Sequence, residues 1–294
     1  MKIALGVNPL APAAIAIGRT VVAALRSRAD LVLSEDTDRA LGGPGLPTRP
    51  IEALDAEVLV SVGGDGSFLW SLLRTSMPLL PINAGTVGFL AEVDGRDAAA
   101  VGEALDRLVG GRYVVEGRMK LACEGPDGAL PDATNEIVVH TSQVAKMRLF
   151  EIGVDGHPVG RIRADGILLA TPTGSTSYSL SALGPIVEPT LEAIVVTALA
   201  PFQTTQRAVV VDPLRTVSVR LVRPEKDGVV VIDGQSETRI PGGTTLRAYR
   251  SPRRASFVRF GLGFYEQLRG KRILPWSEEA PPDPSDGADL PPPA

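Results

Sequence analysis

The chain has 294 residues, enough for one large domain or two ordinary ones. Hydrophobic residues make up 44% and charged residues 22% of it, and no apolar run approaches the roughly 18 residues that a transmembrane helix needs. The formal net charge of −4 argues against a non-specific nucleic-acid binder, which carries a net basic surface. We therefore expect a protein that binds neither nucleic acid nor a membrane.

The first residues read as a strand and lack the apolar stretch and cleavage site of a signal peptide, so we expect a cytoplasmic protein. A single cysteine, Cys123, excludes an intramolecular disulfide, and we expect it to be a small buried residue. The two histidines, His140 and His157, do not have the spacing of a zinc site.

The N-terminal part alternates between strand and helix patterns. Strands are predicted at 2–7, 30–34, 57–62 and 79–82, and helices at 12–28, 67–75 and 97–108. This alternation predicts a three-layer α/β domain, with a parallel sheet covered on both faces, over residues 1–110.

The pattern changes after Gly110 and Gly111 to short strands separated by turn signals, which predicts a β-rich domain over 111–260. Helix is expected there only after the serine- and threonine-rich stretch at 173–183. A C-terminal helical segment, 261–275, is expected to pack back on the body. Residues 276–294 contain five acidic residues, six prolines and no Lys or Arg, which predicts a disordered tail. Without this tail the formal charge changes from −4 to +1.

The first candidate site is Gly63-Gly64-Asp65-Gly66-Ser67, between a predicted strand and a predicted helix. Ligands of open α/β sheets bind at the carboxyl ends of strands, and a helix N-terminus offers free N–H groups to phosphate. A carboxylate in such a loop needs another task, such as holding a metal ion or accepting a proton from a hydroxyl. The plain alternative is an Asp-Gly turn. The chain contains no Walker A loop.

Two further stretches carry polar groups suited to a ligand. The strand that ends at Ala170 runs into the hydroxyl-rich segment 171–181, where Tyr178 offers an aromatic face to a base. The alternative there is an elaborate capped turn before a helix. The adjacent amide and carboxylate of Asn135 and Glu136 could bind a base and a ribose diol, but a solvated strand end is the more common reason for such a pair when it stands alone.

Taken together, these motifs resemble the NAD kinase family, in its archaeal type, from Met1 to about Leu274. The resemblance rests on Gly-Gly-Asp-Gly-Ser at 63–67, the segment 83–90, Asn135-Glu136, Ala-Asp-Gly at 164–166 and Thr-Pro-Thr-Gly-Ser-Thr-Ser-Tyr-Ser-Leu-Ser at 171–181. The first motif is shared with diacylglycerol, sphingosine and phosphofructokinase-type kinases, whereas the last is close to diagnostic. The chain has Ser67 where the family commonly has Thr, and Phe202 where many bacterial members have His.

The resemblance implies an active site between the two domains. It implies transfer of a phosphoryl group from ATP or polyphosphate to the 2′-hydroxyl of the adenosine ribose of NAD, with Mg²⁺ or another divalent metal. Asp65 would accept the hydroxyl proton or help to hold the metal, whose ligands the sequence does not otherwise assign. The family also implies a homo-oligomer, either a dimer or a tetramer.

Family positions carry over to two sets of binding residues. Those for the donor phosphates are Gly63, Gly64, Gly66 and Ser67. The other cofactor-binding positions are Asn135, Glu136, Lys146, Arg163, Asp165, Thr173, Thr176, Ser177, Tyr178, Ser179, Leu180, Ser181, Ala200 and Gln235, of which Asn135, Thr176, Ser177, Tyr178 and Ser181 would hold the adenosine half of NAD. Within the second set, Glu136 would lie on a ribose diol, Asp165 and Ala200 near the nicotinamide, and Lys146 and Arg163 would supply positive charge. Gln235 would close the pocket.

Other classes of protein stay open at this point. One is another kinase of the same superfamily, acting on a lipid or a sugar. Another is a non-catalytic regulator that binds dinucleotides, although such a protein gains nothing from a carboxylate like that of Asp65. A serine hydrolase fits least, because Ser175 lacks the GxSxG context. The sequence fixes neither the phosphate donor nor the choice between NAD and NADH.

Overall fold

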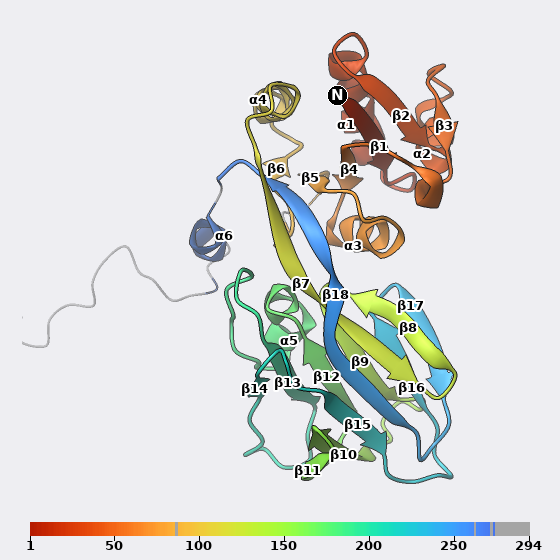
Figure 1. The fold of residues 1–294 in the computed structure, drawn as a ribbon, viewed down its shortest axis with the longest axis vertical. Helices are drawn as coiled ribbons and strands as arrows, with labels where there is room; N and C mark the ends of the chain where they lie inside the picture. Colours follow the sequence, from red (N-terminus) through yellow and green to blue (C-terminus); the bar gives the residue numbers. More distant parts are fainter. Residues whose placement is uncertain (86–87, 262, 271–272, 274–294) are drawn as a thin grey trace, which may run out of the picture. The chain divides into compact units, whose positions relative to one another are not determined.

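The computed structural model describes residues 1–85, 88–261, 263–270 and 273. Residues Met1–Phe260 form one compact unit (Figure 1), and the chain from Gly261 forms a second. The second unit contains a short helix, α6 (Phe264–Gly270), so the expected C-terminal helix is present, while its packing on the body stays a prediction. The expected tail, 276–294, lies outside the described residues.

The N-terminal part of the larger unit is built on parallel strands that are mostly buried on both faces, because their residues are nearly all apolar. These strands follow the order β5-β4-β1-β2-β3, and β6 also pairs with β5. Their bounds are β1 (Lys2–Val7), β2 (Asp30–Ser34), β3 (Thr48–Arg49), β4 (Val58–Gly63), β5 (Leu79–Asn83) and β6 (Val93–Asp94).

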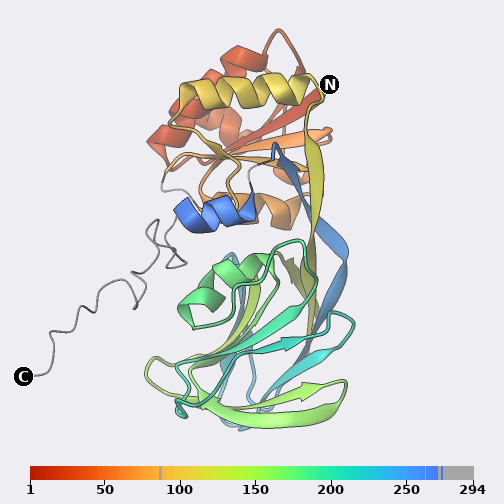
Figure 2. The same ribbon diagram turned by 90° about the vertical axis from the view of Figure 1, so that its left-hand side faces the viewer.

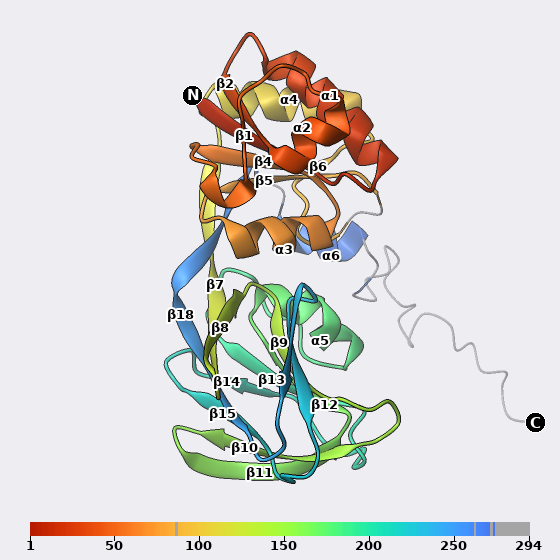
Figure 3. The same ribbon diagram turned by 90° about the vertical axis from the view of Figure 1, so that its right-hand side faces the viewer.

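Helices cover both faces of these strands, as predicted. Alternate residues of one strand point to opposite faces, so Ile3 and Leu5 pack under α1 (Pro12–Leu25), α2 (Glu35–Leu41) and α4 (Ala98–Val109). Ala4 packs on the other face with α3 (Asp65–Arg74) and the 3₁₀ turn η1 (Ile51–Ala53). Figure 3 shows α1 and α4 on one side of the strands and α3 on the other. The three-layer α/β prediction is confirmed.

The C-terminal part of the unit is a sandwich of two sheets. One is a six-stranded antiparallel sheet with the order β14 (Val209–Val211), β13 (Ile194–Leu199), β12 (Gly166–Ala170), β9 (Glu136–Thr141), β16 (Gly228–Ile232) and β17 (Ser236–Ile240). The facing strands are β7 (Val114–Gly125), β8 (Gly128–Ala133), β10 (Arg148–Val154), β11 (His157–Ala164), β15 (Val217–Leu221) and β18 (Thr245–Arg259).

The core between these sheets includes Phe150, Ile167 and Cys123, so the expectation of a buried cysteine is confirmed. Burial raises the pKa of the Cys123 thiol to about 12, which keeps it protonated and unreactive. The serine- and threonine-rich stretch forms a 3₁₀ turn, η2 (Thr173–Thr176), followed by a single helical turn, α5 (Tyr178–Ser181).

Two long strands connect the parallel and the antiparallel parts. β7 pairs with β18 in antiparallel fashion, and Figures 1 and 2 show the two strands side by side along their length. At its far end β18 turns into a parallel neighbour of β5, with Phe257 opposite Leu79. One 12-stranded sheet therefore runs through both parts of the described chain. The expected division into domains at residues 110 and 111 stays a prediction.

Candidate active site

Two cavities lie on either side of the N-terminus of α3. The larger one, of about 540 Å³, is lined by Gly64, Gly66 and Ser67 together with residues that follow β1 and β2. The smaller one, of about 260 Å³, is lined by Asp65 and Gly66 together with residues of the β-rich part. Gly66 lines both cavities, so the glycine-rich loop found in the sequence forms the wall between them.

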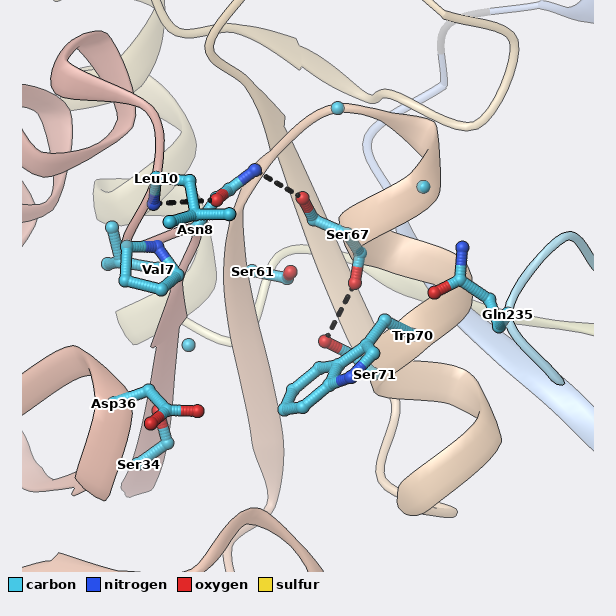
Figure 4. A pocket seen from close by; sticks show the side chains of 14 residues that line it. Val7, Asn8, Leu10, Ser34, Asp36, Ser61, Ser67, Trp70, Ser71 and Gln235 are labelled. Atoms are coloured by element: carbon cyan, nitrogen blue, oxygen red, sulfur yellow. Dashed lines mark hydrogen bonds between the residues drawn. The ribbon is translucent and has the colours of Figure 1, made fainter.

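The local structure of this loop explains its glycines. A Cβ added to Gly63 would lie 2.5 Å from Oγ of Ser67, too close for any larger residue. Oγ of Ser67 accepts a hydrogen bond from Nδ2 of Asn8 at 3.1 Å, as Figure 4 shows. Gly64 is the N-cap of α3 and has no side chain to cap the helix. The N-terminus of a helix carries partial positive charge, which favours an anion beside this loop.

Asp65 is held in place by the chain that follows β5. Its Oδ2 accepts a hydrogen bond from the backbone N–H of Phe89 at 2.9 Å, and its Oδ1 accepts a longer one from Leu90 at 3.4 Å. A Cβ added to Gly88 would overlap the Asp65 carboxylate, so this segment approaches it closely. The carboxylate is thus oriented beside the smaller cavity before any substrate binds.

The opposite wall of the smaller cavity consists of polar residues from the β-rich part. Its members are Asn135, Glu136, Thr173, Thr176, Ser177, Asp233 and Gly234. Among the described residues, three buried side-chain atoms of this wall lack a hydrogen-bond partner: Oδ1 of Asn135, Oε2 of Glu136 and Oγ1 of Thr173. Buried polar atoms are nearly always paired, so a cluster of unpaired ones beside a cavity indicates a binding site for a polar ligand.

Burial also changes the chemistry of two carboxyl groups in this wall. It raises the pKa of Glu136 to about 8; the charge of Asp233 adds to this rise, and a hydrogen bond from Ser177 opposes it. Burial likewise raises the pKa of Asp233, while hydrogen bonds from the backbone at residues 134–136 counteract the rise. Glu136 therefore changes its charge near neutral pH.

The larger cavity has a different lining. Asn8, Ser34, Ser61, Ser71 and Gln235 contribute neutral polar groups, Asp36 a carboxylate and Trp70 an indole ring (Figure 4). No lysine or arginine occurs among its described lining residues. Gln235 comes from the β-rich part, lines this cavity and lies near Gly66, while its predicted role in closing the pocket stays a prediction.

Several residues predicted for cofactor binding do not line either cavity. Lys146 lies in an exposed turn. The guanidinium of Arg163, on β11, stacks on the ring of Phe202 with Cζ 5.5 Å from the ring centroid. Asp165 and Ala200 are adjacent, since the N–H of Asp165 donates to the carbonyl of Leu199. The binding roles of these residues stay predictions.

The residues of α5 also lie outside both linings. Tyr178 and Ser181 are exposed and Leu180 is partly buried, so these three could meet a ligand only outside the cavities. Ser179 is fully buried, and its hydroxyl lies 3.3 Å from that of Thr197. This contact ties α5 to β13.

Several lining residues were not foreseen from the sequence. Asp233 in the smaller cavity and Asp36 and Trp70 in the larger one fall outside the motifs. The only signal for Asp233 was its position in an Asp-Gly turn, where it adopts a positive φ of 51°. Such turns are common in β-rich chains, and the one at Asp155 and Gly156 lines neither cavity.

The fold and the site together define an enzyme that transfers phosphoryl groups. A glycine-rich turn and a helix N-terminus at the carboxyl edge of a parallel sheet suit a phosphate group. This loop lies between two cavities, and the fixed carboxylate of Asp65 lines the smaller one. Among the described residues, no group of three or more His, Cys, Asp or Glu side chains is arranged to hold a metal ion.

Comparisons with known proteins identify the family. Residues 45–113 match the ATP-NAD kinase N-terminal domain, and residues 134–260 match the ATP-NAD kinase C-terminal domain. The NAD kinase of Thermoplasma volcanium is 35% identical over 273 residues, which cover 93% of this chain and 98% of that protein. That of Methanothermobacter thermautotrophicus is 43% identical over 226 residues, which cover 76% and 78% of the two chains.

Solved structures agree with this assignment. The crystal structure of an NAD kinase from Archaeoglobus fulgidus in complex with ATP is 30% identical, with a TM-score of 0.73 over 92% of this chain and 98% of that one. Yeast NADH kinase complexed with NADH shares the fold, with a TM-score of 0.81 over 96% and 90% of the chains at 22% identity. The chain belongs to the NAD kinase family, and its reaction is the phosphorylation of NAD.

The family assignment confirms the fold class and the activity expected from the sequence. None of the helices in the described ranges is long and apolar enough to cross a bilayer.

Proposed function

We propose that NAD binds with its adenosine ribose in the smaller cavity and that the terminal phosphate of ATP lies over the N-terminus of α3. The observation that carries this proposal is the position of Asp65. It lies at the N-terminus of α3 and lines the same cavity as the unpaired polar atoms of Asn135, Glu136 and Thr173. The 2′-hydroxyl then lies beside a carboxylate, with the phosphate on the other side of Gly66.

In the proposed reaction, the 2′-oxygen forms a bond to the γ-phosphorus while the bond from that phosphorus to the bridging oxygen of ATP breaks. The hydroxyl proton passes to the carboxylate of Asp65. Phosphoryl transfer is accelerated mainly by positioning and by neutralisation of charge. The hydrogen bonds from Phe89 and Leu90 supply positioning, because they fix the carboxylate that must meet the hydroxyl.

A divalent cation fits this site if the phosphates of the substrate supply most of its ligands. Mg²⁺ is usually bound by one or two carboxylates, substrate phosphates and water, and Asp65 can contribute one such carboxylate. The absence of lysine and arginine from the described lining of the larger cavity supports the same conclusion, because the protein offers little charge of its own to the phosphates. When bound, the cation supplies that positive charge.

The lining of the larger cavity favours a nucleotide over inorganic polyphosphate as the donor. A polyanion would need cationic side chains, whereas the cavity offers the indole of Trp70 and the carboxylate of Asp36, which suit a base and a ribose. The relative from Archaeoglobus fulgidus was solved with ATP. We therefore propose ATP as the donor.

The test is a coupled assay with purified protein, NAD, ATP and Mg²⁺, in which an NADP-specific dehydrogenase measures the product. Metal-dependent formation of NADP from ATP, with little from polyphosphate, is the expected result. Replacing NAD by NADH in the same assay measures the acceptor preference. NAD binding with no product from any donor would instead identify a non-catalytic regulator.

The proposal includes a homo-oligomer, a dimer or a tetramer, that acts in the cytoplasm. Val209 and Val210 on β14, at the edge of the six-stranded sheet, are about half exposed, which supports association through apolar surface. Light scattering from the purified protein measures the oligomeric state, and fractionation of cells measures the location.

A further inference from the structure

Asp233 is a buried carboxylate with an unusual set of partners. It directly follows β16 and only 4% of its surface is exposed. Its Oδ2 accepts a hydrogen bond from the N–H of Thr134 at 2.7 Å, and its Oδ1 accepts from the N–H groups of Asn135 at 2.8 Å and Glu136 at 3.0 Å. One side chain thus satisfies three consecutive backbone donors almost a hundred residues away.

The bonded segment leads into β9, at a point where the backbone would otherwise leave its donors unpaired. The contact is reciprocal, because the N–H of Asp233 donates to the carbonyl of Glu136 at 3.0 Å. On the other side, the carbonyl of Asn135 accepts from the N–H of Thr171 at 2.8 Å. The backbone of Asn135 and Glu136 is therefore fixed from both sides, and with it the direction in which their side chains leave the strand.

Those side chains carry two of the three unpaired polar atoms of the smaller cavity, Oδ1 of Asn135 and Oε2 of Glu136. Leaving such atoms unpaired is costly without a ligand. Two acceptor atoms that lack partners and are also held rigidly are what a preorganised binding site requires. The carboxylate of Asp233 supplies that rigidity.

We propose that Asp233 is a positioning residue for the dinucleotide: its three backbone hydrogen bonds hold Asn135 and Glu136 in the geometry that binds NAD. This inference rests on the proposed placement of the adenosine ribose in the smaller cavity. Asp233 acts through its neighbours rather than on the reacting atoms, so its loss weakens NAD binding more than it slows the phosphoryl transfer itself.

The charged groups that influence Asp233 are Glu136 on β9 and Lys120 on β7, and Lys120 also interacts with Asp132 on β8. The charge of Asp233 contributes to the raised pKa of Glu136. A neutral residue at position 233 therefore lowers the pKa of Glu136. A lower pKa of Glu136 in the variant distinguishes a charged positioning group from a merely structural residue, because loss of a structural residue would not change that pKa.

The test variant is Asp233→Asn, which keeps the size of the side chain and tolerates the positive φ of 51°. The amide has only one acceptor oxygen, so its NH₂ group would face a backbone N–H. We expect the KM for NAD to rise about ten- to hundredfold, which is the range of the cost of leaving one buried donor unpaired. The KM for ATP and kcat should stay within about twofold at saturating NAD, below the scale of one lost hydrogen bond.

Asp155→Asn is the matched control. Asp155 also precedes a glycine, has a φ of 50° and accepts a backbone hydrogen bond, from Thr216 at 2.9 Å, but it lines neither cavity. The control should leave both KM values unchanged. In Asp233→Asn the pH dependence of kcat/KM for NAD should also move to lower pH, whereas in the control it should not.

A second measurement needs no variant. Hydrogen exchange of wild-type protein without NAD should show the N–H groups of Thr134, Asn135 and Glu136 already protected. Exchange that is fast until NAD is added would overturn the proposal, as would an unchanged KM for NAD in Asp233→Asn or a loss confined to kcat. Failure of the proposed function would appear separately, as an absence of NADP formation by the wild-type enzyme.

Discussion

Asp65 and Glu136 line the same cavity but differ in their neighbours. The carboxylate of Asp65 accepts two backbone hydrogen bonds, whereas Glu136 is buried with Oε2 unpaired. The first arrangement suits a group that meets the 2′-hydroxyl in the proposed reaction. The second leaves Oε2 of Glu136 available to accept a hydrogen bond from a ligand. Substitutions at these two residues should consequently affect different steps.

Replacing Asp65 by Asn should remove the proton acceptor while keeping the shape of the side chain. We expect kcat to fall by at least about a thousandfold, within the range that general base catalysis contributes. The Kd for NAD, measured by calorimetry, should change only a few-fold because Asn135, Glu136 and Thr173 remain. Near-normal turnover in Asp65→Asn would contradict the role assigned to Asp65.

The raised pKa of Glu136, about 8, predicts a pH dependence of NAD binding. As pH rises from 6 to 9 the group ionises, and the ionised carboxylate then offers one charged acceptor oxygen to each of the two hydroxyls of a ribose. The affinity for NAD should increase over this window. Calorimetry across it should give a flat profile for Glu136→Gln, and a slope that persists in this variant would assign the titration to another group.

The same pKa makes a prediction about folding stability. The folded protein holds a proton at Glu136 that the unfolded chain releases above its ordinary pKa of 4.5. The contribution of this group to stability is therefore complete below pH 4.5 and is lost as pH rises to about 8. Urea unfolding between these limits should show a shallower pH dependence in Glu136→Gln than in the wild type.

Among the elements, the turn η2 approaches Asn135, the residue before β9, so closely that only glycine fits at residue 174. A Cβ on Gly174 would overlap the carbonyl oxygen of Asn135, and backbone cannot move aside as a side chain can. Gly174→Ala should therefore displace Asn135, weaken NAD binding and destabilise the fold by at least about 1 kcal/mol, as overpacking does.

The control for this substitution is Gly102→Ala on α4, where nothing lies within 4 Å of an added Cβ. Alanine is the better helix former, so we expect a gain of about 0.5–1 kcal/mol in stability and no effect on NAD binding. Urea unfolding and calorimetry measure both variants. Equal behaviour of the two would show that the approach of η2 to Asn135 does not restrict residue 174.

The longer elements of the N-terminal part could be predicted from the sequence, because apolar periodicity specifies them. The short elements β3, η1 and β6 and the helix α2 were not predicted. In α2 only Thr37 and Leu41 are buried, so it lacks a helical pattern. Its helix is defined instead by local capping, with Ser34 accepting from the N–H of Thr37 and Gly42 in the left-handed conformation. Such short capped helices carry little periodic signal.

In the larger unit, residues 1–260, the parallel and antiparallel parts belong to one continuous sheet, and a buried ion pair lies where they meet. Arg259, near the end of β18, donates to Glu92 at 2.9 Å and to the carbonyl of Leu90, which belongs to the segment that holds Asp65. Glu92 also accepts from the N–H of Phe260. These contacts join the end of β18 to the chain that precedes β6.

Because of this shared sheet, we expect residues 1–260 to unfold in a single cooperative transition. Scanning calorimetry should show one peak, and NAD should move that whole peak to higher temperature. Two separate peaks, with only one of them responding to NAD, would contradict a common folding unit.

The site could be predicted only in part from the sequence, because some of its residues come from segments far apart in the chain. Gly63 to Ser67 and Asn135-Glu136 were found because each motif is contiguous. Asp233 and the pairing of Phe257 with Leu79 were not, because each depends on segments far apart in the chain. Local patterns do not encode such long-range partners.

The pairing of β18 with β5 also has a consequence for synthesis of the chain. The outer edge of β5 is covered near its end by Val93 and Asp94 of β6, but at Leu79 it is covered by Phe257. While the ribosome is still adding the β-rich part, that stretch of the edge is bare and can pair with another nascent chain. The N-terminal sheet, although translated first, is completed only when the last strand emerges.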